Sequence, residues 1–191
     1  MNFCSHCGSR RIEFRIPDGD NLCRHVCADC GTVHYLNPKI VVGCLPEWED
    51  QVLLCRRAIE PRHGLWTLPA GFLENGESVT AGAIRETIEE AGARVAIGEL
   101  YSLITLASIG QVYMMFRARL ADLDFAPGPE SLDVRLFRED EIPWEEIAFR
   151  TITRTLRTYF LDRKTGGFPL RLSVLERKPP RGPLQPHEHG R

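Results

Sequence analysis

The sequence predicts an α/β protein in which helices cover a mixed β-sheet, with a small cysteine-containing module in front of it. Three observations lead to this fold class. Strand-like apolar segments surround one helical segment and precede another along residues 37–165, an order that fits a mixed sheet covered by helices. Two closely spaced pairs of cysteines stand near the start of the chain, and clustered glutamates lie between glycines in residues 71–92.

The first module, residues 1–36, contains two C-x-x-C pairs separated by 19 residues. This spacing is typical of zinc ribbons, in which four thiolates complete one tetrahedral site. Disulfides are the alternative, but the N-terminus has no apolar run that would act as a secretion signal. We expect a structural Zn²⁺ that supplies much of the module's folding free energy. The expected ligands are Cys4, Cys7, Cys27 and Cys30.

The remaining cysteines and the nearby histidines are not expected to bind zinc. Cys23, Cys44 and Cys55 lie in apolar or mixed surroundings and are predicted to be buried free thiols of a reducing cytosol. His6, His25 and His34 are close in sequence, but four thiolates already complete the site.

The second domain is predicted over residues 37–165. Residues 40–45 are almost continuously apolar, as in a strand buried on both faces. Apolar residues recur at helical spacing over residues 144–163. Residues 166–191 form a C-terminal extension, in which proline and charge predict disorder from about residue 178. Further strands of this domain are expected at residues 52–55, 65–68, 100–106, 111–120 and 134–137, and one strand of the first module is expected at residues 12–16.

Residues 71–92, GFLENGESVTAGAIRETIEEAG, predict a loop followed by a helix. Ser78 is a suitable N-cap, and Gly92 stands where a helix end favours a positive φ. Glu86, Glu89 and Glu90 have the spacing i, i+3 and i+4, so a helix brings three carboxylates to one face, opposite an apolar stripe. A solvated charged face is the alternative, whereas a bound Mg²⁺ would offset the repulsion, grip phosphate oxygens and activate water.

The segment from Gly71 to Ala93 resembles the Nudix box, the signature of hydrolases that cleave a nucleoside diphosphate linked to another moiety. Thr87 stands where that family usually has a bulky aliphatic residue. The resemblance implies the Nudix α/β/α sandwich with a mixed sheet. It also implies Mg²⁺ (or Mn²⁺) held mainly by Glu86 and Glu90, with Glu89 assisting and with Arg85 and Glu77 orienting the ligands.

The resemblance extends from Cys4 to about Phe160. Segments such as VCADCGTVHYLNPKIVVG and ESLDVRLFREDEIPWEEIAF are similar to a bacterial and plastid Nudix group that has an N-terminal zinc ribbon and hydrolyses ADP-ribose and FAD. It therefore implies metal-dependent hydrolysis of a diphosphate bond that releases AMP. NADH pyrophosphatases carry a motif beginning SQPWPFP after the box, and this chain has YSLITLASIGQV there.

Three further side chains are candidates for the site. Glu130, in an E-x-x-D element that matches one of the NADH pyrophosphatases, is expected to join the metal ligands and, like Glu89, is a candidate general base, with Asp133 as the reserve. A surface loop acid is the alternative. Arg57 is expected to bind phosphate, with a surface salt bridge as the alternative. Trp66 is expected to contact substrate, with a place in the core as the alternative.

Composition agrees with a cytoplasmic enzyme, and the resemblance implies a small-molecule nucleotide substrate. The 191 residues carry a net charge of −2 and are 43% hydrophobic, so one sizeable core is possible and no basic field attracts nucleic acid. No stretch is long enough for a membrane span, and we expect a homodimer. An NADH or NAD-cap pyrophosphatase and a nucleotide-pool cleansing enzyme are alternative functions. A non-catalytic nucleotide-sensing regulator is a third, although such proteins usually lose box residues that are intact here.

Overall fold

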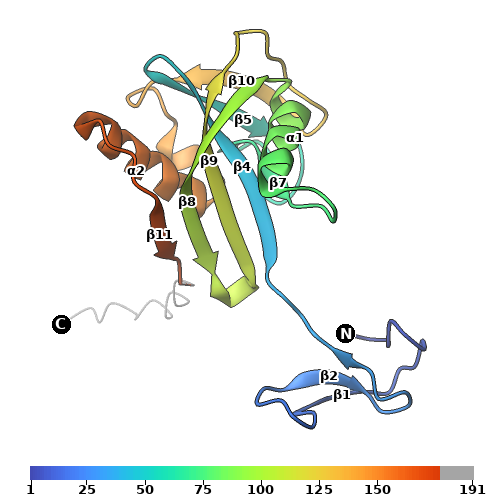
Figure 1. Ribbon diagram of the computed structural model, residues 1–191. Helices are drawn as coiled ribbons and strands as arrows, with labels where there is room; N and C mark the ends of the chain where they lie inside the picture. Colours follow the sequence, from blue (N-terminus) through green and yellow to red (C-terminus); the bar gives the residue numbers. More distant parts are fainter. Residues whose placement is uncertain (177–191) are drawn as a thin grey trace, which may run out of the picture. The chain divides into compact units, whose positions relative to one another are not determined.

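A computed structural model describes residues 1–176 of the chain, which divides into two compact units, Met1–Pro38 and Lys39–Arg191. The disorder predicted from about residue 178 lies outside the described residues. In the first unit, β1 (Ile12–Arg15), β2 (Arg24–Cys27) and β3 (Val33–His34) form an antiparallel sheet (Figure 1).

The second unit is built on an eight-stranded sheet with the order β10-β5-β4-β9-β8-β11, to which β6 adds beside β5 and β7 beside β4. The β4–β9 and β8–β11 pairs are parallel and the others are antiparallel, so the sheet is mixed as the sequence predicted. The strands are β4 (Lys39–Trp48), β5 (Gln51–Arg57), β6 (Trp66–Thr67), β7 (Ala70–Phe72), β8 (Val95–Leu106), β9 (Gln111–Leu120), β10 (Ser131–Phe137) and β11 (Arg171–Val174).

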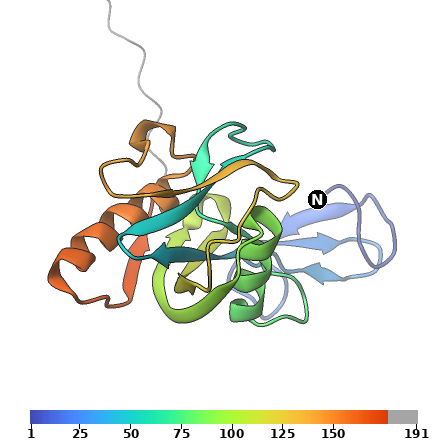
Figure 2. The same cartoon turned by 90° about the horizontal axis from the view of Figure 1, so that it is seen from above.

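Two helices, α1 (Val79–Ala91) and α2 (Arg150–Thr165), lie on opposite sides of this sheet (Figures 1 and 2). Side chains of β4 alternate between the two layers: Val42 and Cys44 pack in a cluster with Ala83 of α1, and Leu45 packs with Leu156 of α2. The expected α/β/α sandwich is therefore confirmed. Within residues 1–176, neither helix combines the length and the apolar character required to cross a bilayer.

Three local features differ from the sequence-based expectations. The last helix begins at Arg150 rather than near residue 144, because Ile147 pairs with Trp66 as an isolated bridge and the Ala148 amide donates to Trp66 O at 2.8 Å. The 3₁₀ helix η2 (Trp144–Glu146) precedes this bridge, and a second one, η1 (Ala107–Ile109), joins β8 to β9. β11 was not predicted, and Cys23 is exposed rather than buried.

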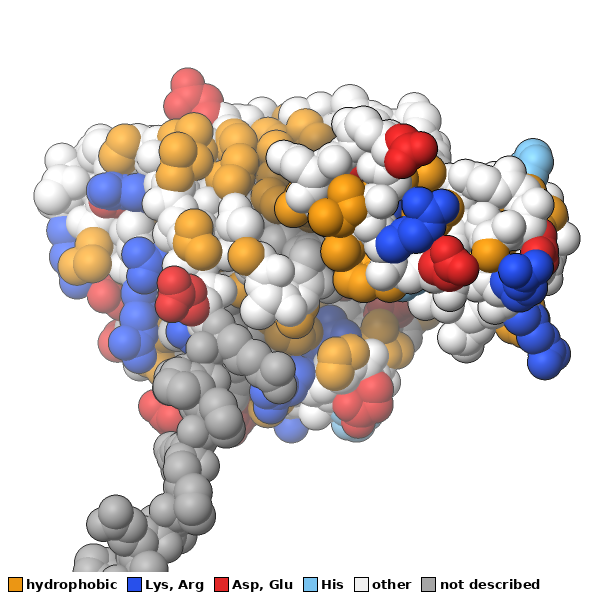
Figure 3. All heavy atoms as spheres, turned by 90° about the horizontal axis from the view of Figure 1, so that it is seen from below, with side chains coloured by type: hydrophobic (Ala, Val, Ile, Leu, Met, Phe, Trp, Pro, Cys, Tyr) orange, Lys and Arg blue, Asp and Glu red, His pale blue; other side chains and the backbone are white. Residues whose placement is uncertain are grey.

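Hydrophobic side chains also remain at the surface, as Figure 3 shows for one face of the molecule. In β11, at the edge of the sheet, Leu172 and Val174 are 69% and 62% exposed, and Ser173 between them is the residue of this strand that is partly buried. Ile109, in the connection between β8 and β9, is 60% exposed. Among the described residues, none covers these side chains.

Candidate active site

The helix α1 begins and ends where the sequence predicted. The Ala81 amide donates to Ser78 Oγ at 3.1 Å, and Gly92 adopts a φ of 60° with its amide donating to Ile88 O. These two caps satisfy backbone groups that a helix leaves without intrahelical partners. The caps therefore fix the register in which α1 presents its carboxylates.

Glu90 does not share the exposed position of Glu89. Glu90 is only 5% exposed, whereas the Glu89 side chain is 57% exposed. Glu90 follows Ala83 by seven residues, two helical turns, which places both on the buried face of α1. The predicted opposition of the carboxylates to the apolar stripe is thus wrong for Glu90. The stripe was also expected to include Ile88, which is 49% exposed.

Arg85 holds three carboxylates in place. Its Nη2 and Nε donate to Glu77 at 2.8 and 3.1 Å, and its Nη1 donates to Glu86 at 2.7 Å and to Glu89 at 3.0 Å. Nη2 also donates to Phe72 O at 3.2 Å, which ties β7 to the helix. The hydrogen bonds to Glu77 are the main cause that raises the pKa of Arg85. The guanidinium is therefore a fixed cation that orients both Glu86 and Glu89.

Gly71 allows β7 to approach these carboxylates closely. A Cβ atom at Gly71 would overlap the Glu86 carboxylate. The neighbouring Ala70 amide donates to Glu90 Oε2 at 3.3 Å. The absence of a side chain at this position is therefore required by the packing of Glu86, rather than by backbone conformation.

The loop that carries Glu130 is attached to the end of α1. The amides of Ala126 and Gly128 donate to the carbonyl oxygens of Ala91 and Glu90, at 3.0 and 3.1 Å. The Ala58 amide donates to Glu130 O at 2.8 Å, which anchors the loop beside the end of β5. The Glu130 carboxylate contributes to raising the pKa of Glu90, so it lies within electrostatic reach of α1. Asp133, the reserve ligand, instead forms an ion pair with Arg135 at 2.6 Å.

Burial and mutual repulsion perturb the central carboxylates. Burial, followed by the charge of Glu86, raises the pKa of Glu90 to about 8. Burial is also the main cause that raises the pKa of Glu86. A nearby positive charge would stabilise the ionised form of both carboxyl groups, and oxygen donors suit a hard divalent cation such as Mg²⁺ or Mn²⁺. The donor set therefore fits a divalent metal.

These carboxylates line a cavity of about 1010 Å³. Arg57 lies in it with its guanidinium 5.2 Å from the centre of the Phe149 ring, and its Nε donates to Pro61 O at 3.0 Å. Within residues 1–176, Arg57 makes no ion pair with a carboxylate, so its charge is available to a ligand. Other lining side chains that the sequence did not single out are Phe72, Ile109, Gln111, Tyr113, Phe149 and Thr151.

Trp66 is a correction to the predicted set. It is 6% exposed, belongs to the core cluster beneath α2 and packs edge-on against Phe137 with ring centres 4.9 Å apart. It is absent from the walls of the large cavity, which its neighbour Thr67 lines instead. Because successive side chains of a strand point to opposite faces, the pairing of β6 with β5 sends the indole into the core.

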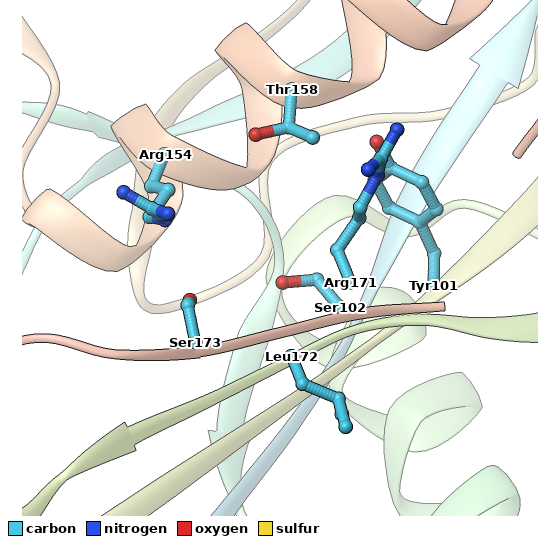
Figure 4. Close-up of a pocket in the computed structure, with 7 residues that line it drawn as sticks. All are labelled: Tyr101, Ser102, Arg154, Thr158, Arg171, Leu172 and Ser173. Atoms are coloured by element: carbon cyan, nitrogen blue, oxygen red, sulfur yellow. The ribbon is translucent and has the colours of Figure 1, made fainter. Parts of the chain in front are cut away.

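A second, smaller cavity of about 190 Å³ lies beside α2 and β11 (Figure 4). In the described part of the chain no carboxylate contributes to its walls, and Arg171, which lines it, is already paired with Asp162. It therefore lacks the groups that bind a metal, and the larger cavity is the candidate active site. The lining residues are Tyr101, Ser102, Arg154, Thr158, Arg171, Leu172 and Ser173.

The four predicted zinc ligands come together in the first unit. Their sulfur atoms all lie within 4.8 Å of one another, and in the described residues no other group of three or more potential ligand atoms is as compact. The Cys4–Cys30 and Cys7–Cys27 sulfur distances are 3.7 and 3.6 Å, too long for disulfides and close to the ~3.8 Å between thiolates that surround a tetrahedral Zn²⁺. Both glycines that follow the pairs, Gly8 and Gly31, have a φ of 74°. The thiols therefore fit a zinc ion.

Comparison with known protein families gives two matches that together cover most of the chain. A model described as the NUDIX domain matches residues 37–156, and a model of the Nudix N-terminal zinc ribbon matches residues 2–36. A crystal structure of a NUDIX hydrolase from Nitrosomonas europaea is 56% identical and covers 93% of this chain and 100% of its own, with a TM-score of 0.89.

Two curated relatives have named activities. The NAD-capped RNA hydrolase NudC of Pseudomonas aeruginosa is 31% identical over 169 residues, which are 86% of this chain and 57% of the relative. The ADP-ribose pyrophosphatase of Methanocaldococcus jannaschii is 40% identical over 58 residues, which are 30% of this chain and 34% of the relative. This chain thus spans little more than half the length of the NudC relative.

Proposed function

Because this chain belongs to the Nudix family, we propose that it is a metal-dependent pyrophosphatase that cleaves ADP-ribose or FAD at the diphosphate bond and releases AMP. The observation that carries this proposal is the large cavity, whose walls include all four glutamates that the sequence singled out for the site. Arg57 shares these walls and makes no ion pair with a carboxylate of residues 1–176. The glutamates are Glu86, Glu89, Glu90 and Glu130.

Glu86, Glu90 and Glu130 would hold Mg²⁺ or Mn²⁺. A divalent cation at these oxygens would supply a Lewis acid that offsets negative charge on the diphosphate and promotes ionisation of the attacking water. The burial and mutual repulsion of Glu86 and Glu90 support this role, because a cation relieves both.

The other polar side chains would orient the metal ligands, accept the proton of the attacking water and neutralise charge on the diphosphate. Arg85 fixes the directions of Glu86 and Glu89 through its hydrogen bonds. Glu89, which is exposed, or Glu130, which stands on the anchored loop, would accept the proton from water. Arg57, held by Pro61 O, would bind a diphosphate oxygen through its fork of donors. Reaction at a diphosphate depends mostly on such positioning and charge.

The cavity walls also offer apolar surface, which would contact a part of the substrate other than its diphosphate. Phe72, Ile109, Tyr113 and Phe149 give the cavity aromatic and aliphatic walls, which suit a nucleoside base. Similarity to an ADP-ribose pyrophosphatase supports ADP-ribose. The NudC relatives, named as NAD-capped RNA hydrolases, favour NADH or an NAD-capped RNA end as a second candidate.

The four clustered thiols would bind a structural Zn²⁺. The first unit has few fully buried hydrophobic side chains, among them Cys4, Val26 and Cys27, so metal ligation supports its fold.

A substrate panel tests the proposal. ADP-ribose, FAD, NADH, an NAD-capped RNA and 8-oxo-dGTP are compared by kcat/KM with Mg²⁺ and with Mn²⁺. The proposal expects ADP-ribose or FAD to lead, with AMP among the products. A tenfold lead by NADH or the capped RNA, equivalent to about 1.4 kcal/mol of transition-state stabilisation, would transfer the assignment to the second candidate. A lead by 8-oxo-dGTP would instead indicate nucleotide-pool cleansing.

A further inference from the structure

We propose that the N-terminal end of α2 is a phosphate subsite of the large cavity, in which Thr151 and the free backbone amides bind one phosphate of the substrate. The inference rests on the proposed function, since that phosphate is one of the two that the cleaved bond joins. It assigns a role to a part of the cavity that carries none of the box residues.

The first observation is the open end of the helix. α2 has 16 residues, and Phe149, Arg150, Thr151 and Ile152 at its start all line the cavity. No side chain of residues 1–176 caps this end, and the first helical bond there runs from the Thr153 amide to Phe149 O at 3.0 Å. The amides before Thr153 therefore lack intrahelical acceptors, and such a terminus carries partial positive charge that favours an anion.

The second, independent observation is the Thr151 hydroxyl. Thr151 is 2% exposed, and its Oγ1 is buried without a hydrogen-bond partner among the described residues. Leaving such a hydroxyl unpaired costs free energy, so a native structure normally supplies a partner. Thr151 is one of the residues that line the cavity, although its Oγ1 atom is itself buried. In the proposal the side chain turns when phosphate binds, and the hydroxyl donates to a phosphate oxygen.

The third observation is the adjacent charge. The Arg57 guanidinium lies over the ring of Phe149, the N-cap residue of α2, and its charge lowers the pKa of Glu90. Arg57 is therefore within electrostatic reach of the carboxylates while touching the helix end. In the proposal, one phosphate of the diphosphate lies beside the carboxylates and the other at the start of α2. The Arg150 side chain donates to Glu176 O at 2.9 Å and is not needed.

The variant Thr151→Val tests the subsite, because it removes the hydroxyl and keeps the β-branched shape. Thr155→Val is its matched control. Thr155 lies one turn later in α2, is 1% exposed, and donates from Oγ1 to Ser102 Oγ at 3.2 Å, beside the smaller cavity that Figure 4 shows. Thr151→Ser, which restores the hydroxyl, should recover binding.

Titration calorimetry with Mg²⁺ present measures the affinities for AMP and for ribose 5-phosphate, and thermal unfolding is followed without ligand. Thr151→Val should weaken binding of one of the two at least about tenfold, as expected for a lost hydrogen bond to a charged group. The product affected identifies which phosphate the subsite holds. The ligand-free variant should have a higher Tm, whereas Thr155→Val should have a lower Tm and unchanged affinities.

Unchanged affinities for both products in Thr151→Val, a lower Tm for that variant, or no binding of either product to the wild-type protein would overturn the subsite. Hydrolysis of ADP-ribose by the wild-type protein is measured separately. If hydrolysis occurs and Thr151→Val binds both products normally, the subsite is wrong and the proposed function stands. If products bind in a Thr151-dependent way without hydrolysis, the subsite stands and the function is wrong.

Discussion

Replacing Glu90 with glutamine should stabilise the protein when no divalent cation is added to the buffer. The carboxylate is 5% exposed, and burial together with the charge of Glu86 raises its pKa from 4.5 to about 8. One factor of ten in proton affinity corresponds to ~1.4 kcal/mol. At pH 7 the carboxyl is ionised in the unfolded chain and has to take up a proton on folding, which lowers the unfolding free energy by about 3 kcal/mol. Glutamine removes the charge and keeps an oxygen that can accept from the Ala70 amide.

The effect should depend on pH in a defined direction. Because the folded-state pKa of Glu90 is raised, its contribution to stability is complete below about pH 4.5 and is lost as the pH rises through about 8. The gain from Glu90→Gln should therefore grow from below about 1 kcal/mol at pH 5 to about 3 kcal/mol at pH 7.

Urea unfolding at both pH values, in buffer without added divalent cations or chelator, measures this gain while leaving a tightly held zinc in place. Glu99→Gln, at an exposed position of β8 away from the cavity, is the control and should change stability little. With Mg²⁺ present, Glu90→Gln should also reduce kcat by about 10² or more, as for other electrostatic catalytic groups. A variant that is less stable at pH 7, or that keeps most of its kcat at saturating Mg²⁺, refutes the reasoning.

Three further predictions concern other parts of the chain. The purified protein should contain one zinc per chain, which Cys4→Ser loses and the exposed Cys23→Ser retains by elemental analysis; a zinc-free wild-type protein would contradict this. Gly71→Ala should displace the Glu86 carboxylate and lower kcat at least about tenfold. Gly167→Ala, whose Cβ meets open space, is the control and should keep its kcat; equal rates for the two variants would show that the close approach of β7 to Glu86 is unimportant. Arg57→Gln should raise KM for ADP-ribose about tenfold or more, while its neighbour Arg56, outside the cavity walls, tolerates the same change; a KM unaltered by the Arg57 substitution would remove it from the site.

The parts of the site that lie on α1 could be predicted from the sequence because helical spacing determines them. The caps at Ser78 and Gly92 follow from short separations along the chain, and so does the i, i+4 contact of Arg85 with Glu89. The orienting role of Arg85 and Glu77 came from the family resemblance, and their ion pair agrees with it. The paired cysteines are a similar case, since a tetrahedral thiolate site restricts their spacing strongly. Fixed local geometry made these predictions possible.

The remaining features depend on contacts between distant segments. The loop of Glu130 reaches α1 only through amides that bond to its last carbonyl oxygens, and nothing in the spacing indicates this. The burial of Glu90 and the placing of Trp66 in the core depend on which face of each element meets the sheet. The start of α2 lines the cavity because the bridge between Ile147 and Trp66 delays the first residue of that helix to Arg150. Such pairings cannot be read from one local pattern.

Release of AMP from ADP-ribose, followed by chromatography during a Mg²⁺ titration, tests the central claim most directly. The wild-type protein should produce AMP and ribose 5-phosphate in equal amounts, with a rate that saturates in Mg²⁺ and is close to zero without it. Glu90→Gln, folded as shown by its urea transition, should give at most about one hundredth of that rate. Equal rates with and without divalent cation, or full activity of the variant, would contradict a metal-dependent pyrophosphatase site at these carboxylates.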